Sequence, residues 1–263
     1  VAPAPLRLTP ESVVEACDES RQRLRVDSIP LYQLHFPDPI TLPGQQIQPL
    51  WQLPARAAGV EDRKNEVYWD GLAECYLRGL VKNVGVSNYG PSLLAEAHEH
   101  LAKRGVPLVS NQISLSLMNH RGSAGTVRAC RELGVRVIAC YPLANGALAG
   151  KYNPNDHTTL SPTDGFKFKM RFMRKLLKGG SPVVDAVRDV AERRGKTCAQ
   201  VALNWCVTAQ GAVAIAGART PAHVAENAGA LGWSLTESEA AELEAASALS
   251  NEFVTARMHL LGD

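Results

Sequence analysis

The stretch VKNVGVSNYGPSLLAEAHEHLAKRGVPLVSNQISL, residues 81–115, decides the fold, because it holds a strand, a helix and the next strand in immediate succession. The apolar runs at 81–86 and 107–114 predict the two strands. Pro91 marks the first position of the helix and Gly105 its end, since proline suits a first turn and glycine takes a positive φ readily. A strand, a crossover helix and a second strand predict parallel neighbours in one sheet.

The same alternation continues on both sides of this stretch. Further strands are predicted at 29–35, 135–141 and 212–216, and further helices at 10–24, 67–78, 122–133, 183–194, 198–209 and 237–249. Capping-box pairs, Thr197 with Gln200 and Thr236 with Glu239, set the starts of the last two helices. The fold class is therefore α/β, and the strand order fits the last five units of a TIM (β/α)8 barrel. On this interpretation the first three strands are missing and the barrel is incomplete.

Length and composition predict one domain over residues 1–263. The sequence has no run of about 18 apolar residues and no signal-peptide pattern, so we expect a soluble protein without a membrane partner. The formal net charge of +2 gives no reason to expect a nucleic-acid partner. Six scattered cysteines without a C-x-x-C pair predict reduced thiols. Oligomeric state is not predicted.

Two segments interrupt the alternation. The proline-rich segment 37–65 predicts a long loop or insertion after the first strand. Residues 153–181 include the basic run KFKMRFMRKLLK at 167–178. That run is compatible with an anion-binding or membrane-surface helix, but a solvated loop or helix face is the favoured interpretation.

Polar or turn-forming residues stand at the carboxyl end of every predicted strand. In a parallel barrel these ends share one mouth, where the working side chains lie. They are His35, Ser87 with Asn88, Gln112, residues 140–143, and residues 217–219. Taken alone, His35 fits a hydrogen-bonded core histidine slightly better than an active-site residue. Beside four other polar strand ends it becomes the candidate catalytic residue.

Four of these strand ends carry motifs that resemble those of the aldo-keto reductase family. They are GVSNY at 85–89, NQISLSL at 111–117, YPLANGALAGKY at 141–152 and AGARTPAHVAEN at 216–227. The chain is most similar to the branch with the plant plastid enzymes and the β subunits of voltage-gated potassium channels. The resemblance implies a TIM barrel that binds NADP without a Rossmann fold. It also implies hydride transfer to the carbonyl of a small aldehyde or ketone, in the chloroplast or cytoplasm.

The resemblance implies a role for each matching residue. His35 matches the substrate-orienting histidine, which would hydrogen-bond the carbonyl oxygen as it becomes negative. Side chains that hydrogen-bond the nicotinamide carboxamide are matched by Ser87, Asn88 and Gln112. The other cofactor-binding positions are Cys140, Tyr141, Pro142, Leu143 and Lys151, and, around the adenosine and its 2′-phosphate, Gly217, Arg219, His223, Glu226 and Asn227.

The segment after residue 218 supports a phosphate site on physical grounds. Thr220 can cap a helix that begins at Pro221, so free N–H groups and the positive helix end face the space beside Arg219. A charge-assisted contact from Arg219 would favour NADP over NAD. The alternative is an exposed helix start with a surface arginine.

The sequence also departs from the family pattern. The family's proton donor is a tyrosine assisted by a lysine and an aspartate from early strands, and none has a counterpart here. Tyr32 falls within a strand and Tyr68 and Tyr76 on a helix, so none is a substitute. Cys140 stands where the nicotinamide-stacking tyrosine is expected, with Tyr141 displaced by one position. Three hypotheses stay open: a reductase represented without its first units, a cofactor-binding regulatory or partner protein with little turnover, and a fragment that does not fold alone. Substrate identity is not predicted.

Overall fold

The structure is a computed structural model, and it describes residues 9–37, 65–150 and 181–249. Lys151, the basic run 167–178 and nearly all of the predicted insertion 37–65 lie outside the described residues. The chain forms two compact units. Of the described residues, the first unit holds 9–37, 65–112 and 128–136, and the second holds 113–127, 137–150 and 181–249.

Three parallel strands form the sheet of the first unit. They are β1 (Tyr32–Leu34), β2 (Val84–Ser87) and β3 (Leu108–Ser114), in that order. All four residues of β2 are buried, because strands on either side and helices on its face remove it from water. The sequence therefore predicts this part of the sheet correctly, including its parallel sense.

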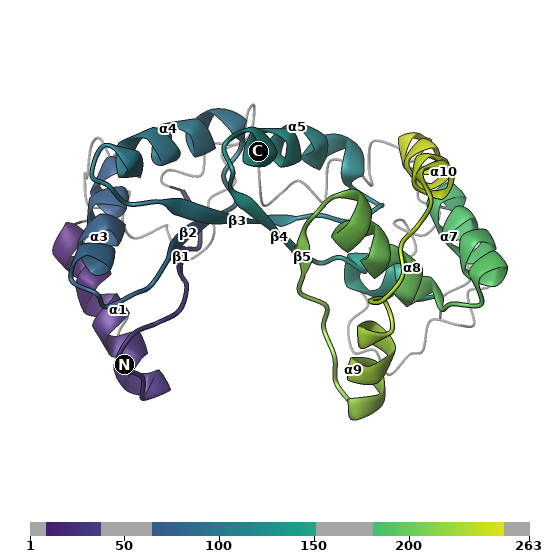
Figure 1. Ribbon diagram of the computed structural model, residues 1–263, viewed down its shortest axis with the longest axis horizontal. Helices are drawn as coiled ribbons and strands as arrows, with labels where there is room; N and C mark the ends of the chain where they lie inside the picture. The colour runs from purple at the N-terminus through teal and green to yellow at the C-terminus, as the bar shows by residue number, and fades with distance from the viewer. Residues whose placement is uncertain (1–8, 38–64, 151–180, 250–263) are drawn as a thin grey trace, which may run out of the picture. The chain divides into compact units, whose positions relative to one another are not determined.

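Three helices accompany these strands: α1 (Pro10–Leu24), α3 (Asn65–Leu77) and α4 (Pro91–Ala102). Figure 1 shows α1 lying against α3. Their backbones approach closely at Gly71, where a β-carbon would lie 2.5 Å from the Val13 β-carbon. Glycine at 71 is therefore a packing requirement, and a capping box at Thr9 fixes the start of α1.

The second unit contains the end of β3 and the strands β4 (Arg136–Cys140) and β5 (Val213–Ala214). Strands β4 and β5 pair in parallel. Its helical elements are α7 (Ser181–Arg194), α8 (Cys198–Asn204), α9 (Pro221–Ala228) and α10 (Glu237–Ala248), with most of α5 (His120–Glu132) and the short 3-10 segment η2 (Ala144–Ala149). Figure 1 shows α7 beside α10. The predicted helix 198–209 is α8 followed by a π turn, η4 (Trp205–Ala209).

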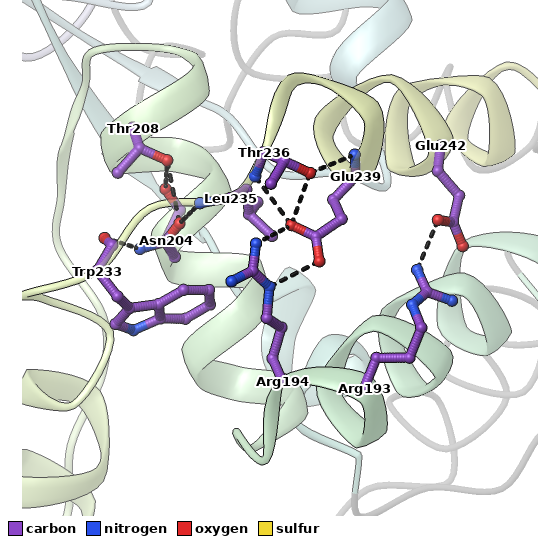
Figure 2. A network of polar contacts seen from close by, with 9 residues as sticks. All are labelled: Arg193, Arg194, Asn204, Thr208, Trp233, Leu235, Thr236, Glu239 and Glu242. Carbon is purple, nitrogen blue, oxygen red and sulfur yellow. Dashed lines mark hydrogen bonds and ion pairs between the residues drawn. The ribbon is translucent and has the colours of Figure 1, made fainter.

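Ion pairs join α7 to α10 (Figure 2). Arg194 Nε donates to Glu239 Oε1 at 2.7 Å, and Arg193 donates to Glu242 at 2.6 Å. Glu239 also accepts from the backbone N–H of Thr236 at 2.8 Å, so the pair reinforces the predicted capping box. This arginine holds the pKa of the Glu239 carboxyl at about 2.

The fully buried Asn204 fastens the chain that leads into α10 (Figure 2). Its Nδ2 donates to the carbonyl oxygens of Ala230 and Trp233 at 2.9 and 2.8 Å. Its Oδ1 accepts from Leu235 N at 3.1 Å and from Thr208 Oγ1 at 3.0 Å. One buried side chain therefore satisfies four polar groups, as burial demands.

All five predicted strands and the predicted helices are found at their expected places, with ends that differ by a few residues. All six cysteines are free thiols, as predicted. Among the described helices, none is long and apolar enough to cross a membrane. In the same residues, no group of histidine, cysteine and carboxylate side chains is arranged to hold a metal ion.

Candidate functional site

The carboxyl ends of β1, β2 and β3 bring four predicted site residues together in the first unit. Ser87 pairs with Gln112 in the sheet register, and its Oγ donates to the Gln112 carbonyl at 2.8 Å. Asn88 N donates to the same carbonyl at 2.9 Å. The Asn88 side chain then donates from Nδ2 to Ser87 Oγ at 3.1 Å and to the His35 carbonyl at 2.8 Å. All four predicted residues of this group, His35 included, are therefore linked by hydrogen bonds.

Asn88 makes these contacts from a left-handed backbone conformation, with φ 65°. Asparagine is one of the few non-glycine residues that visits this region readily. The turn after β2 thus directs the side chain back over the strand ends. Ser87 and Asn88 are both buried, at 3% and 8% exposure, so the hydrogen bonds are shielded from water.

Two side-chain amide atoms of this cluster are free to form a hydrogen bond with a ligand. Gln112 Oε1 accepts from Gln33 Nε2 at 3.3 Å, while no described residue accepts from Gln112 Nε2. In Asn88 the nitrogen is engaged, and within the described part of the chain nothing donates to its Oδ1. The cluster therefore offers one donor and one acceptor from adjacent strand ends. A primary carboxamide requires that combination, because its oxygen accepts and its NH2 group donates. The donor set fits a nicotinamide carboxamide.

Within the described structure the Ser87 hydroxyl also contacts the neighbouring strand. Its hydroxyl hydrogen is donated to the Gln112 carbonyl, so it braces the two strands. The structure also adds Gln33, a polar residue within the short strand β1, which sequence reasoning missed. The signal was present, since a glutamine in the run LYQL departs from an otherwise apolar strand.

His35 lies one residue beyond β1 and is exposed. Its ring stacks on that of Phe36, with centroids 4.3 Å apart and planes at 28°. Its backbone is held by the Asn88 side chain. An exposed imidazole on a fixed backbone at a strand end is available for hydrogen bonding to a small substrate.

The second unit holds the other predicted cluster, at the start of α9. Thr220 caps this helix by accepting from His223 N at 3.2 Å, and Pro221 occupies the first helical position, as predicted. His223 Nδ1 accepts from Arg219 N at 3.3 Å, which folds the loop back on the helix. Arg219 is exposed, and no described carboxylate forms an ion pair with its guanidinium. An unpaired cation beside a helix start fits an anionic phosphate.

The rest of that cluster is fastened to α8. Gln200 Nε2 donates to the Glu226 carbonyl at 3.1 Å, and a β-carbon at Gly229 would lie 2.2 Å from this nitrogen. Asn227 lines a pocket of about 320 Å³ together with apolar side chains that include Leu203 of α8, Ala214 of β5 and Val224 of α9. Gly217, on the approach to Arg219, is exposed with open space around it. An apolar pocket near a phosphate-type helix start is suited to a purine ring.

The end of β4 differs from the expected strand 135–141. The strand stops at Cys140, and Tyr141 lies beyond it with φ 54° and 47% exposure. Its orientation is therefore set by a turn rather than by strand alternation. Pro142 is buried, and Leu143 precedes η2. Burial raises the pKa of the Cys140 thiol to about 11, so the thiol is protonated at neutral pH.

The model of the aldo/keto reductase family matches residues 1–248. The chain belongs to this family. Chloroplastic pyridoxal reductase of Arabidopsis thaliana is 39% identical over 241 residues, which are 91% of this chain and 59% of that protein. The chain thus spans about three fifths of the length of this relative. Members of the aldo/keto reductase family use NADP(H) and act on small carbonyl compounds.

Solved structures of the same fold are also similar. The aldose reductase from Schistosoma japonicum has a TM-score of 0.65 and 23% identity, covering 93% of this chain and 66% of that one. A Bombyx mori aldo-keto reductase in complex with NADP has a TM-score of 0.62 and 19% identity, covering 90% and 64%. These likenesses support the barrel-type α/β fold expected from the strand order.

Proposed function

We propose that this chain binds NADPH and serves the NADPH-dependent reduction of a small aldehyde or ketone. The observation that carries the proposal is the pair of open amide atoms, Asn88 Oδ1 and Gln112 Nε2, at adjacent strand ends. Together they match both halves of a carboxamide, and a ring held through its carboxamide presents one defined face. Membership of the aldo/keto reductase family supports the same cofactor.

The chain's own residues would act by binding and orientation. When bound, NADPH supplies the hydride that adds to the carbonyl carbon. His35 would donate a hydrogen bond to the carbonyl oxygen as negative charge develops there, and removing such a donor costs about 10²- to 10³-fold in rate. Arg219 and the start of α9 would hold the 2′-phosphate, with the pocket beside Asn227 for the adenine.

The name of the Arabidopsis relative suggests a substrate. We include pyridoxal in the proposal as the first aldehyde to test, and the chloroplast as the compartment to examine, since that relative is named a chloroplastic enzyme. The choice of substrate depends on residues outside the strand-end cluster, because the variable loops of a barrel make that choice.

The binding experiment compares NADPH with NADH by fluorescence titration of the chain. We expect NADPH to bind at least tenfold more tightly, because only NADPH carries the 2′-phosphate that Arg219 can pair with. Arg219→Met should remove most of this preference. Arg193→Met is the matched control. It removes an arginine of α7 that pairs with Glu242, and it should leave the preference for NADPH intact. Equal affinity of the unmodified chain for both nucleotides would contradict the phosphate assignment, and no binding of either would contradict the proposal as a whole.

A further inference from the structure

A glutamine can present either its oxygen or its nitrogen to a ligand, and its neighbours decide which end faces outward. For Gln112 the deciding neighbour is Gln33, whose Nε2 donates to Gln112 Oε1 at 3.3 Å. On its other side, Gln33 Oε1 accepts from Ser110 Oγ at 2.9 Å. Ser110 is buried, with 3% of its surface exposed, so this contact is shielded from water. The two bonds are coupled, because Gln33 can give its Nε2 to Gln112 only while its Oε1 faces Ser110.

This chain of hydrogen bonds crosses β2 at Gly85. In the sheet register Gln33 pairs with Gly85, and Gly85 pairs with Ser110. A β-carbon at Gly85 would lie 2.2 Å from Ser110 Oγ and 3.0 Å from Gln33 Cγ. The two side chains from β1 and β3 therefore meet across the one strand position that has no side chain. The glycine of the GVSNY motif therefore leaves the space in which Gln33 and Ser110 make contact.

We propose that Gln33 is a positioning residue that holds Gln112 with its Nε2 outward, as a donor to the oxygen of the bound carboxamide. This inference rests on the proposed function and adds a residue to it. Gln33 acts through Gln112 and touches no reacting atom. Because both polar atoms of Gln33 are engaged within the sheet, replacing it changes which end of Gln112 is offered.

The discriminating variant is Gln33→Glu. A carboxylate at position 33 still accepts from Ser110, but it has no hydrogen to give to Gln112 Oε1. Gln112 then turns so that its Nε2 donates to the new carboxylate and its Oε1 faces the ligand. Two oxygens would confront each other, and NADPH binding should weaken by at least tenfold. Gln33→Met, which removes the contact without reversing it, should weaken binding by only about threefold.

Two further measurements separate orientation from general damage. Adenosine 2′,5′-bisphosphate has no nicotinamide, so its affinity should be the same for the unmodified chain and for both variants. In the ligand-free chain labelled with ¹⁵N-glutamine, the Gln112 side-chain amide resonances should move on Gln33→Glu, as this amide becomes a donor to a carboxylate.

The outcomes are distinct. Loss of NADPH affinity with bisphosphate affinity unchanged and shifted Gln112 resonances supports the inference. Equal losses for both ligands, or Gln112 resonances that stay in place, overturn it. If the unmodified chain binds no NADPH, the proposed function fails, and the ligand-free resonances still decide whether Gln33 sets the direction of Gln112.

Discussion

Replacing Gly85 with alanine is the most direct perturbation of the strand-end cluster. The new β-carbon would lie 2.2 Å from Ser110 Oγ, well inside van der Waals contact, and 3.0 and 3.1 Å from Gln33 Cγ and the Ser110 carbonyl oxygen. Overpacking of this kind costs about 2 kcal/mol. The Ser110 hydroxyl would also leave Gln33, which costs about 1 kcal/mol more. We therefore expect the free energy of unfolding to fall by about 3 kcal/mol.

A double-mutant cycle with Ser110→Ala tests the cause of that loss. Removing the hydroxyl deletes the closest clash, so Gly85→Ala should cost only about 1 kcal/mol in the Ser110→Ala background. The expected coupling is then about 2 kcal/mol, measured by urea unfolding followed by circular dichroism. Gly217→Ala is the matched control, since a β-carbon there meets nothing within 4 Å, and it should be nearly neutral. Additive costs for the two substitutions would refute the argument that the hydroxyl occupies the space above Gly85.

Further predictions concern other contacts of the two units. Asn88→Asp replaces the donor to the His35 carbonyl with an oxygen, so two oxygens face each other in a buried position; NADPH affinity should fall and the His35 ring resonances should move, and unmoved resonances would show that the contact does not hold His35. Asn204→Ala leaves three backbone groups, those of Ala230, Trp233 and Leu235, without their partner and should cost about 3 to 5 kcal/mol in urea unfolding, whereas a loss under 1 kcal/mol would contradict its fastening role. The hydrogen bond from Arg194 lowers the pKa of Glu239 to about 2, so its stabilisation is full above the unfolded pKa near 4.3 and is lost as pH falls toward 2. Urea midpoints from pH 6 to 2 should therefore fall less steeply for Glu239→Gln than for the unmodified chain.

The elements of the fold could be predicted because glycine, proline and capping residues mark their ends. Pro91 and the capping box at Thr236 begin helices in the structure where the sequence places them. The π turn at 205–209 could not be predicted, since an apolar helical pattern does not distinguish hydrogen bonds four residues apart from those five apart. Likewise the left-handed backbone of Tyr141 depends on the turn that follows β4.

For the candidate site, the sequence identifies the strand ends but not the hydrogen bonds between them. Ser87, Asn88 and Gln112 are polar residues at the ends of apolar strands, which is a local pattern. That the Ser87 hydroxyl is committed to the neighbouring strand follows from the register of β2 against β3, a long-range property. The contacts of Gln33 could not be predicted for the same reason, because they depend on the glycine that pairs with it in the neighbouring strand.

The geometry of Asn88 couples two parts of the proposed reaction. Its Nδ2 fixes the backbone of His35, and that commitment leaves its Oδ1 as the end available to the carboxamide. Gln33 does the same for Gln112 from the opposite side, since engaging the oxygen leaves the nitrogen. The donor and acceptor that a carboxamide needs are therefore each produced by a hydrogen bond made within the protein. Because neither amide can turn without breaking such a bond, the polarity of this cluster is set before any ligand arrives, which is the condition for electrostatic preorganisation.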